Sequence, residues 1–144
     1  MKPVRIVLAA IVVVVMGIAI VGVAQGENEF QGQPEPTAAQ VATSKQQIAA
    51  NPDAVKGKAV FAEEGCNRCH ALAATGANGK LGPRMDGIPD EASENAQYIA
   101  RSMRDSDNIM PRDYAERMSG TELKQVSELI HAAYIKGSGE DEGE

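Results

Sequence analysis

An apolar run near the N-terminus differs from everything that follows it. Residues 6–24 carry no charged side chain, and as a helix these 19 residues span about 28 Å, close to the roughly 30 Å hydrocarbon core of a bilayer. Two cations precede the run and two acidic residues follow it: Lys2, Arg5, Glu27 and Glu29. The pattern predicts a transmembrane anchor over residues 1–25, and the positive-inside rule places the rest outside the cytoplasm. A cleaved signal peptide is the alternative, since the run ends in small residues, GVA.

The first helix signal beyond that run lies in residues 51–65. Asn51 is a good N-cap ahead of a proline at the first helical position, and Gly65 suits the C-terminal stop. Gly57 and Phe61 fall on one face of this helix, four residues apart. Because Gly57 has no side chain, it would let another helix approach closely.

Two more helices are predicted further along the chain. One covers residues 93–104, and the other lies within residues 118–136. In the latter, Ser119 and Glu122 form a capping box. Its apolar stripe has helical spacing: Leu123, Val126, Ile130, Ala133 and Tyr134. No stretch shows the alternation of a strand, so the fold class is predicted to be all-α.

Composition divides the chain further. Residues 26–50 are rich in Gly, Gln, Pro and Ala and predict a flexible or partly helical linker, residues 51–137 predict the folded domain, and residues 138–144 predict a disordered acidic tail. The formal net charge is −6, with no basic run, which argues against a nucleic-acid partner. The sequence has no Trp, two Phe and three Tyr. Because so few aromatics make a poor core, we expect a large apolar cofactor in the middle of the domain.

The candidate chemistry lies in GCNRCH, residues 65–70, which hold both cysteines of the chain, Cys66 and Cys69, followed by His70. A thioredoxin-like dithiol would occur in a βαβ context, for which no strand is predicted. A zinc site needs four ligands, and no second ligand pair follows. The third interpretation uses all three residues: in C-x-x-C-H both sulfurs bond to haem and the histidine is the proximal iron ligand. We therefore predict one covalently attached haem c.

The chain resembles the class I c-type cytochromes over residues 51–137. Four segments carry the resemblance, in the order in which the family has them: GKAVFAEEGCNRCH, LGPRMDGI, NIMP and LKQVSELIHAAYI. The resemblance implies a small domain of three to five helices around the haem, here preceded by the transmembrane helix. It also implies that the first and last helices cross where Gly57 and Phe61 meet Tyr134.

The same resemblance implies roles for two loop residues. The carbonyl of Pro83 is expected to accept a hydrogen bond from the His70 ring nitrogen that faces away from iron, which would orient the ring and raise its basicity. Met110, in NIMP, is expected to be the sixth ligand. Independently, Met110 lies on a predicted loop before a proline that restricts the backbone, 40 residues after His70. The other candidate ligands are Met85, Met103, Met118 and His131, for which packing or ordinary exposure is the simpler explanation.

These ligands predict function. Two filled axial positions leave no open site for a substrate, so we expect a single-electron carrier, not an enzyme, on the extracytoplasmic face of the cytoplasmic membrane. Its partners would be membrane redox complexes, and the acidic charge favours a basic docking patch on them. The alternatives are a fixed haem subunit of a larger oxidase or dehydrogenase, and a gas sensor or peroxidase with a labile distal ligand. Candidate contacts of the haem propionates are Lys80, Arg84 and Tyr98.

Overall fold

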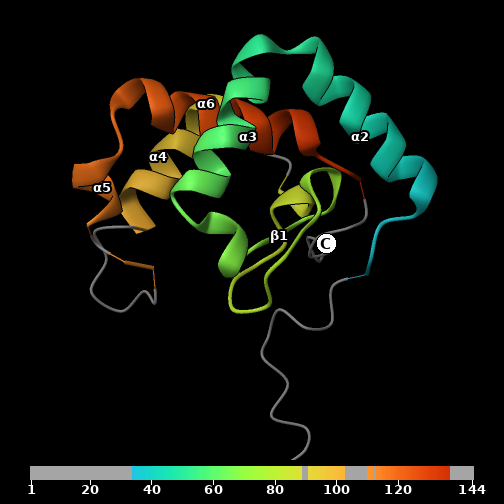
Figure 1. Ribbon diagram of the computed structural model, residues 1–144, viewed down its shortest axis with the longest axis horizontal. Coiled ribbons are helices and arrows are strands. Elements are labelled where there is room, and N and C mark those ends of the chain that lie inside the picture. The colour runs from blue at the N-terminus through green and yellow to red at the C-terminus, as the bar shows by residue number, and fades with distance from the viewer. Residues whose placement is uncertain (1–33, 89–90, 103–109, 112, 137–144) are drawn as a thin grey trace, which may run out of the picture. The chain divides into compact units, whose positions relative to one another are not determined.

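The computed structural model describes residues 34–88, 91–102, 110–111 and 113–136. The anchor predicted over residues 1–25 and the tail predicted over residues 138–144 lie outside the described residues. Within the described ranges, no helix is long and apolar enough to cross a membrane. This part of the chain is mostly helical, as predicted (Figure 1).

Two capped helices form the centre of the fold. Helix α3 (Pro52–Glu63) packs most extensively against α6 (Gly120–Ala133) (Figure 1). The side chain of Asn51 accepts hydrogen bonds from the backbone N–H groups of Asp53 (3.0 Å) and Ala54 (3.2 Å), as expected of an N-cap. The predicted capping box of α6 is confirmed, because the side chains of Ser119 and Glu122 each accept from the other's backbone N–H.

The two helices cross at Gly57, but the partner on α6 differs from the expected one. A Cβ atom on Gly57 would overlap the backbone carbonyl of Gln125 and lie 3.1 Å from Cβ of Leu129. Gly57 therefore contacts α6 in the middle of that helix and not at Tyr134, which caps its C-terminal end. The close approach itself was predicted from the missing side chain, whereas the position of the crossing depends on the packing of the whole interface.

The remaining helices flank this pair. Helix α4 (Ala92–Ser102) lies in the stretch where a helix was predicted and packs on α6. Helix α5 (Tyr114–Arg117) is a single turn that leads into α6. Three short 3₁₀ turns connect the other elements: η1 (Cys66–Arg68), η2 (Ala73–Thr75) and η3 (Met85–Gly87).

A small hairpin corrects the expectation that the chain has no strands. Strands β1 (Ala71–Leu72) and β2 (Ala77–Asn78) pair antiparallel, with Ala71 opposite Asn78. Each strand is only two residues long, which is too short to produce an alternating apolar pattern in the sequence.

Helix α2 (Ala38–Ala50) lies within the stretch predicted as a flexible or partly helical linker. The helix begins with a capping box, in which the Thr37 hydroxyl accepts from the Gln40 N–H (3.3 Å) and the Gln40 side chain accepts from the Thr37 N–H (2.8 Å). It packs against α6 and α3. A helix at this position extends the folded domain toward the N-terminus.

Two side chains of α2 are buried, one turn apart. Ile48 joins the hydrophobic core, and the Ser44 hydroxyl donates a hydrogen bond of 3.0 Å to the carbonyl oxygen of Ala133. Since one of these two positions is polar, the buried face of α2 leaves almost no apolar periodicity in the sequence. This is the physical reason why the sequence alone did not assign the helix to the folded domain.

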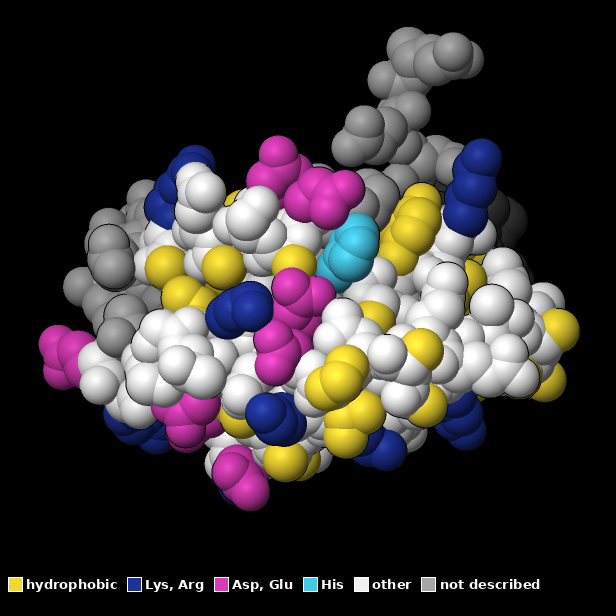
Figure 2. Space-filling view, turned by 90° about the horizontal axis from the view of Figure 1, so that it is seen from above, with side chains coloured by type: hydrophobic (Ala, Val, Ile, Leu, Met, Phe, Trp, Pro, Cys, Tyr) yellow, Lys and Arg dark blue, Asp and Glu magenta, His cyan; other side chains and the backbone are white. Residues whose placement is uncertain are grey.

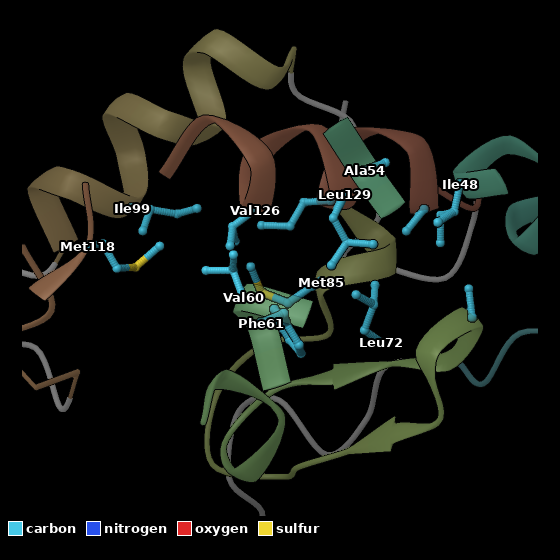
Figure 3. Packing of buried hydrophobic residues seen from close by; sticks show 13 residues of the cluster. Ile48, Ala54, Val60, Phe61, Leu72, Met85, Ile99, Met118, Val126 and Leu129 are labelled. Atoms are coloured by element: carbon cyan, nitrogen blue, oxygen red, sulfur yellow. The ribbon is translucent and has the colours of Figure 1, made fainter. Parts of the chain in front are cut away.

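The core lies between α3, α6 and the loops that follow the CxxCH motif. Figure 3 shows Val60, Phe61 and Met85 close together, on the side of α6 that carries Val126 and Leu129. Phe61 is the one aromatic side chain among the buried hydrophobic residues that the structure describes. The core is thus aliphatic, as the composition indicated.

Candidate functional site

The site begins where α3 ends. Gly65 adopts a left-handed conformation (φ 77°), which glycine tolerates best, and turns the chain into the 3₁₀ turn η1. The N–H groups of Cys69 and His70 both donate to the carbonyl of Cys66, at 3.2 and 2.9 Å. One tight turn therefore carries all three residues of the motif. Both thiols are free and partly buried, and burial raises the pKa of the Cys66 thiol to about 11.

The imidazole of His70 is buried and held in one orientation. It is 8% exposed, and its Nδ1–H donates a hydrogen bond of 3.0 Å to the carbonyl oxygen of Pro83. Burial lowers the pKa of His70, and the hydrogen bond from Nδ1 to Pro83 opposes that shift only in part. Because a carbonyl oxygen only accepts, the proton lies on Nδ1 and the lone pair of Nε2 is left for a metal.

Glycines allow the loop from Gly79 to Pro83 to lie against the motif. The N–H groups of Leu81 and Gly82 both donate to the carbonyl of Cys69, at 3.0 Å each. A Cβ atom on Gly82 would lie 2.7 Å from Nδ1 of His70 and 3.1 Å from its Nε2. A Cβ atom on Gly79 would meet the backbone where Cys69 joins His70. The imidazole thus packs directly against backbone, which no residue larger than glycine permits.

A buried ion pair follows this loop. Nε and Nη2 of Arg84 lie 3.0 and 3.1 Å from the two carboxylate oxygens of Asp86, whose side chain is fully buried. Sequence reasoning considered Arg84 only as a candidate propionate contact and did not single out Asp86. A lone Asp in a loop carries no signal of burial. Lys80 and Tyr98, the other two candidate propionate contacts, are exposed. Contact of Lys80, Arg84 or Tyr98 with the haem propionates stays a prediction.

The candidate distal ligands differ in their surroundings. Met110 is partly buried and packs against the hydrophobic core, whereas Met85 and Met118 are buried members of that core. Nε2 of His131 lies 3.9 Å from a carboxylate oxygen of Glu91. Met103 lies outside the described residues. The assignment of Met110 as a ligand stays a prediction.

The residues present fit a covalently attached haem. Two free thiols on one turn match two thioether bonds, and a buried imidazole beside them has its Nδ1 engaged and its Nε2 lone pair left for iron. The glycine-lined loop holds that ring in place.

Comparison with known proteins identifies the family. The family model described as cytochrome c matches residues 54–136, more than half of the chain. No curated protein and no solved structure matches the chain. The chain belongs to the cytochrome c family, and is an electron-carrying haem protein with covalently bound haem c.

Proposed function

We propose that His70 and Met110 are the two axial ligands of the haem iron, and that the protein is an electron carrier and not an enzyme. The hydrogen bond from His70 Nδ1 to Pro83 supports the first ligand most directly. It holds the buried ring in a single tautomer, and it strengthens the donor character of Nε2. The haem supplies one-electron chemistry at its iron.

The second ligand completes this proposal. Met110 is partly buried against the core, immediately before Pro111, which restricts the backbone conformation of the methionine. A thioether on the distal side raises the reduction potential relative to a second imidazole. With both axial positions filled, the chain leaves no coordination site for a substrate or a gas.

The domain is proposed to work outside the cytoplasm, held at the cytoplasmic membrane by residues 1–25. The uncharged run over residues 6–24 and the two cations before it support this location. Membrane redox complexes are the proposed partners. A simple test is fractionation of cells: the mature chain is expected in the membrane pellet, with its haem domain open to protease added from the outer side.

The net charge of −6 supports docking on a basic patch of the partner. On the face seen in Figure 2, acidic and basic side chains are interspersed. The proposed encounter is therefore steered by overall charge and is transient. Raising the ionic strength is expected to slow electron transfer with the true partner, because salt screens attraction over about 10 Å at 0.1 M. Rates independent of salt would rule out this docking mode.

The ligand assignment is tested by replacing methionines one at a time in the holoprotein. Met110→Leu is expected to abolish the near-infrared band of the sulfur–iron bond and to lower the reduction potential. Met118→Leu, a buried methionine of the core, serves as the matched control and is expected to keep the band. A band that survives Met110→Leu, or carbon monoxide binding to the reduced wild-type protein, would overturn the proposed closed His70/Met110 site.

A further inference from the structure

Asp86 is the most deeply buried charged side chain near the candidate site. Its side chain is 0% exposed, and its carboxylate accepts hydrogen bonds from two nitrogens of Arg84. The backbone N–H of Ala73 also donates to it, at 2.7 Å. A buried carboxylate is costly unless it is paired and hydrogen-bonded, so a site with three such bonds holds its loop in one conformation.

The backbone of Asp86 adds a second attachment. Its carbonyl oxygen accepts a hydrogen bond of 2.7 Å from the N–H of Ile135, just beyond the end of α6. Asp86 therefore ties the loop to the segment after the CxxCH motif through Ala73 and to the last helix through Ile135. The side chain of Arg84 is only 14% exposed, so the partner of this carboxylate is also held within the protein.

These attachments lie on both sides of the carbonyl that contacts His70. Before Pro83, the N–H of Gly82 is held by the carbonyl of Cys69. After it, Arg84 is held by Asp86. The carbonyl of Pro83 belongs to the peptide group that joins Pro83 to Arg84, so turning it away from His70 changes the backbone torsion of Arg84, whose side chain the ion pair holds. The ion pair thus restrains the hydrogen bond to Nδ1 without touching the ring.

We propose that the Arg84–Asp86 pair is a positioning element that keeps the Pro83 carbonyl on Nδ1 of His70 and thereby tunes the reduction potential of the haem. This inference rests on the proposed function, in which His70 is the proximal ligand. A strong hydrogen bond from Nδ1–H makes the imidazole a better electron donor, which favours ferric iron. Loosening the loop therefore raises the potential.

Single substitutions mix this effect with a charge effect. Removing the carboxylate of Asp86 leaves a cation near the site and raises the potential electrostatically, whereas removing the Arg84 guanidinium lowers it. The double variant Arg84→Met/Asp86→Leu removes both charges together and deletes the side-chain hydrogen bonds. The chain offers a matched control in the exposed Lys124–Asp53 pair (3.0 Å), which joins α3 to α6. Lys124→Met/Asp53→Leu removes the same two kinds of charge there.

The experiment uses the reduced holoprotein, which is diamagnetic. The exchange rate of the His70 Nδ1 proton is measured by nuclear magnetic resonance, and the reduction potential by voltammetry. The Arg84/Asp86 double variant is expected to exchange this proton about tenfold faster, as for loss of a typical hydrogen bond. It is also expected to have a higher potential than wild type, whereas the Lys124/Asp53 double variant is expected to match wild type in both.

A second variant covers failure of the double variant to fold. In Asp86→Asn the amide oxygen can still accept from the Ala73 N–H. The amide NH2 group cannot accept, so the variant loses the two-oxygen contact with the Arg84 guanidinium. Faster Nδ1 exchange in this variant supports the inference. The inference would be overturned if the Arg84/Asp86 double variant kept the wild-type Nδ1 exchange rate and the wild-type reduction potential while the two single variants shifted the potential in opposite directions. That result would indicate a charge effect alone. Failure of the proposed function looks different: wild type itself would then lack the strongly shifted signals of an iron-bound His70.

Discussion

Gly57 of α3 lies directly against the backbone carbonyl of Gln125 in α6, with no room for a side chain between the two helices. The contact joins segments that are far apart in the sequence but adjacent at the centre of the fold (Figure 1). Because the opposing atoms belong to helix backbone, they cannot move aside as a flexible side chain would.

Gly57→Ala is therefore expected to destabilise the protein by about 1–3 kcal/mol, the usual cost of forcing extra atoms into a packed interface. Chemical denaturation of the holoprotein measures the free energy of unfolding. The matched control is Gly120→Ala, because a Cβ atom on Gly120 would meet nothing within 4 Å. Equal stabilities for the two variants would show that α3 and α6 are not in this close contact.

Gly82 lies directly against the ring of His70. In Gly82→Ala the new methyl group would press on the imidazole, 2.7 Å from Nδ1 and 3.1 Å from Nε2. We expect the ring to tilt, so that the absorption spectrum and the reduction potential change even in molecules that retain haem. Gly120→Ala again serves as the control, and spectra identical to wild type in Gly82→Ala would contradict the packing described here.

Helix α2 is expected to contribute to the stability of the haem domain. Ser44→Ala removes the buried hydrogen bond to the carbonyl of Ala133, which should cost about 1–2 kcal/mol in the free energy of unfolding. Thr43→Ala is the control, since the exposed Thr43 hydroxyl bonds only within its own helix, to the carbonyl of Ala39. If Ser44→Ala is no more destabilising than Thr43→Ala, α2 does not dock on α6 in solution.

The capping box of α6 predicts a pH dependence. The pKa of Glu122 is lowered, first by the hydrogen bond from the Ser119 N–H and then by the Ser119 side chain. A carboxyl whose pKa is lower in the folded state stabilises the protein above its unfolded pKa, and this contribution is lost as the pH falls through the folded pKa. Glu122→Gln should therefore be less stable than wild type at neutral pH, with a difference that shrinks in acid.

Unfolding of the two proteins is measured at neutral pH and at successively lower values. The exposed Glu63, at the end of α3, provides Glu63→Gln as a control for the loss of one carboxylate charge. If wild type and Glu122→Gln differ by the same free energy of unfolding at neutral pH and in strong acid, the ionised carboxylate does not cap the helix.

Local sequence signals located the helix ends because the groups that cap a helix lie within a few residues of each other. Asn51 accepts from N–H groups two and three residues ahead, and Ser119 and Glu122 are three residues apart. Helix α2 was expected only as part of a tether and not of the folded domain, although it has the same kind of cap at Thr37. Its buried face contains a serine whose acceptor, Ala133, lies 89 residues away in the sequence.

The sequence alone determined that this chain carries a covalent haem, because both attachment sulfurs and the proximal histidine lie within one short motif whose bonds are local. The family match over residues 54–136 agrees with that conclusion. Only the tertiary structure decided which groups surround the motif: the burial of Asp86, its pairing with Arg84, and the contact of Gly57 with Gln125. These depend on how distant segments pack, and burial of a charge or loss of room for a methyl group exists only once the chain has folded.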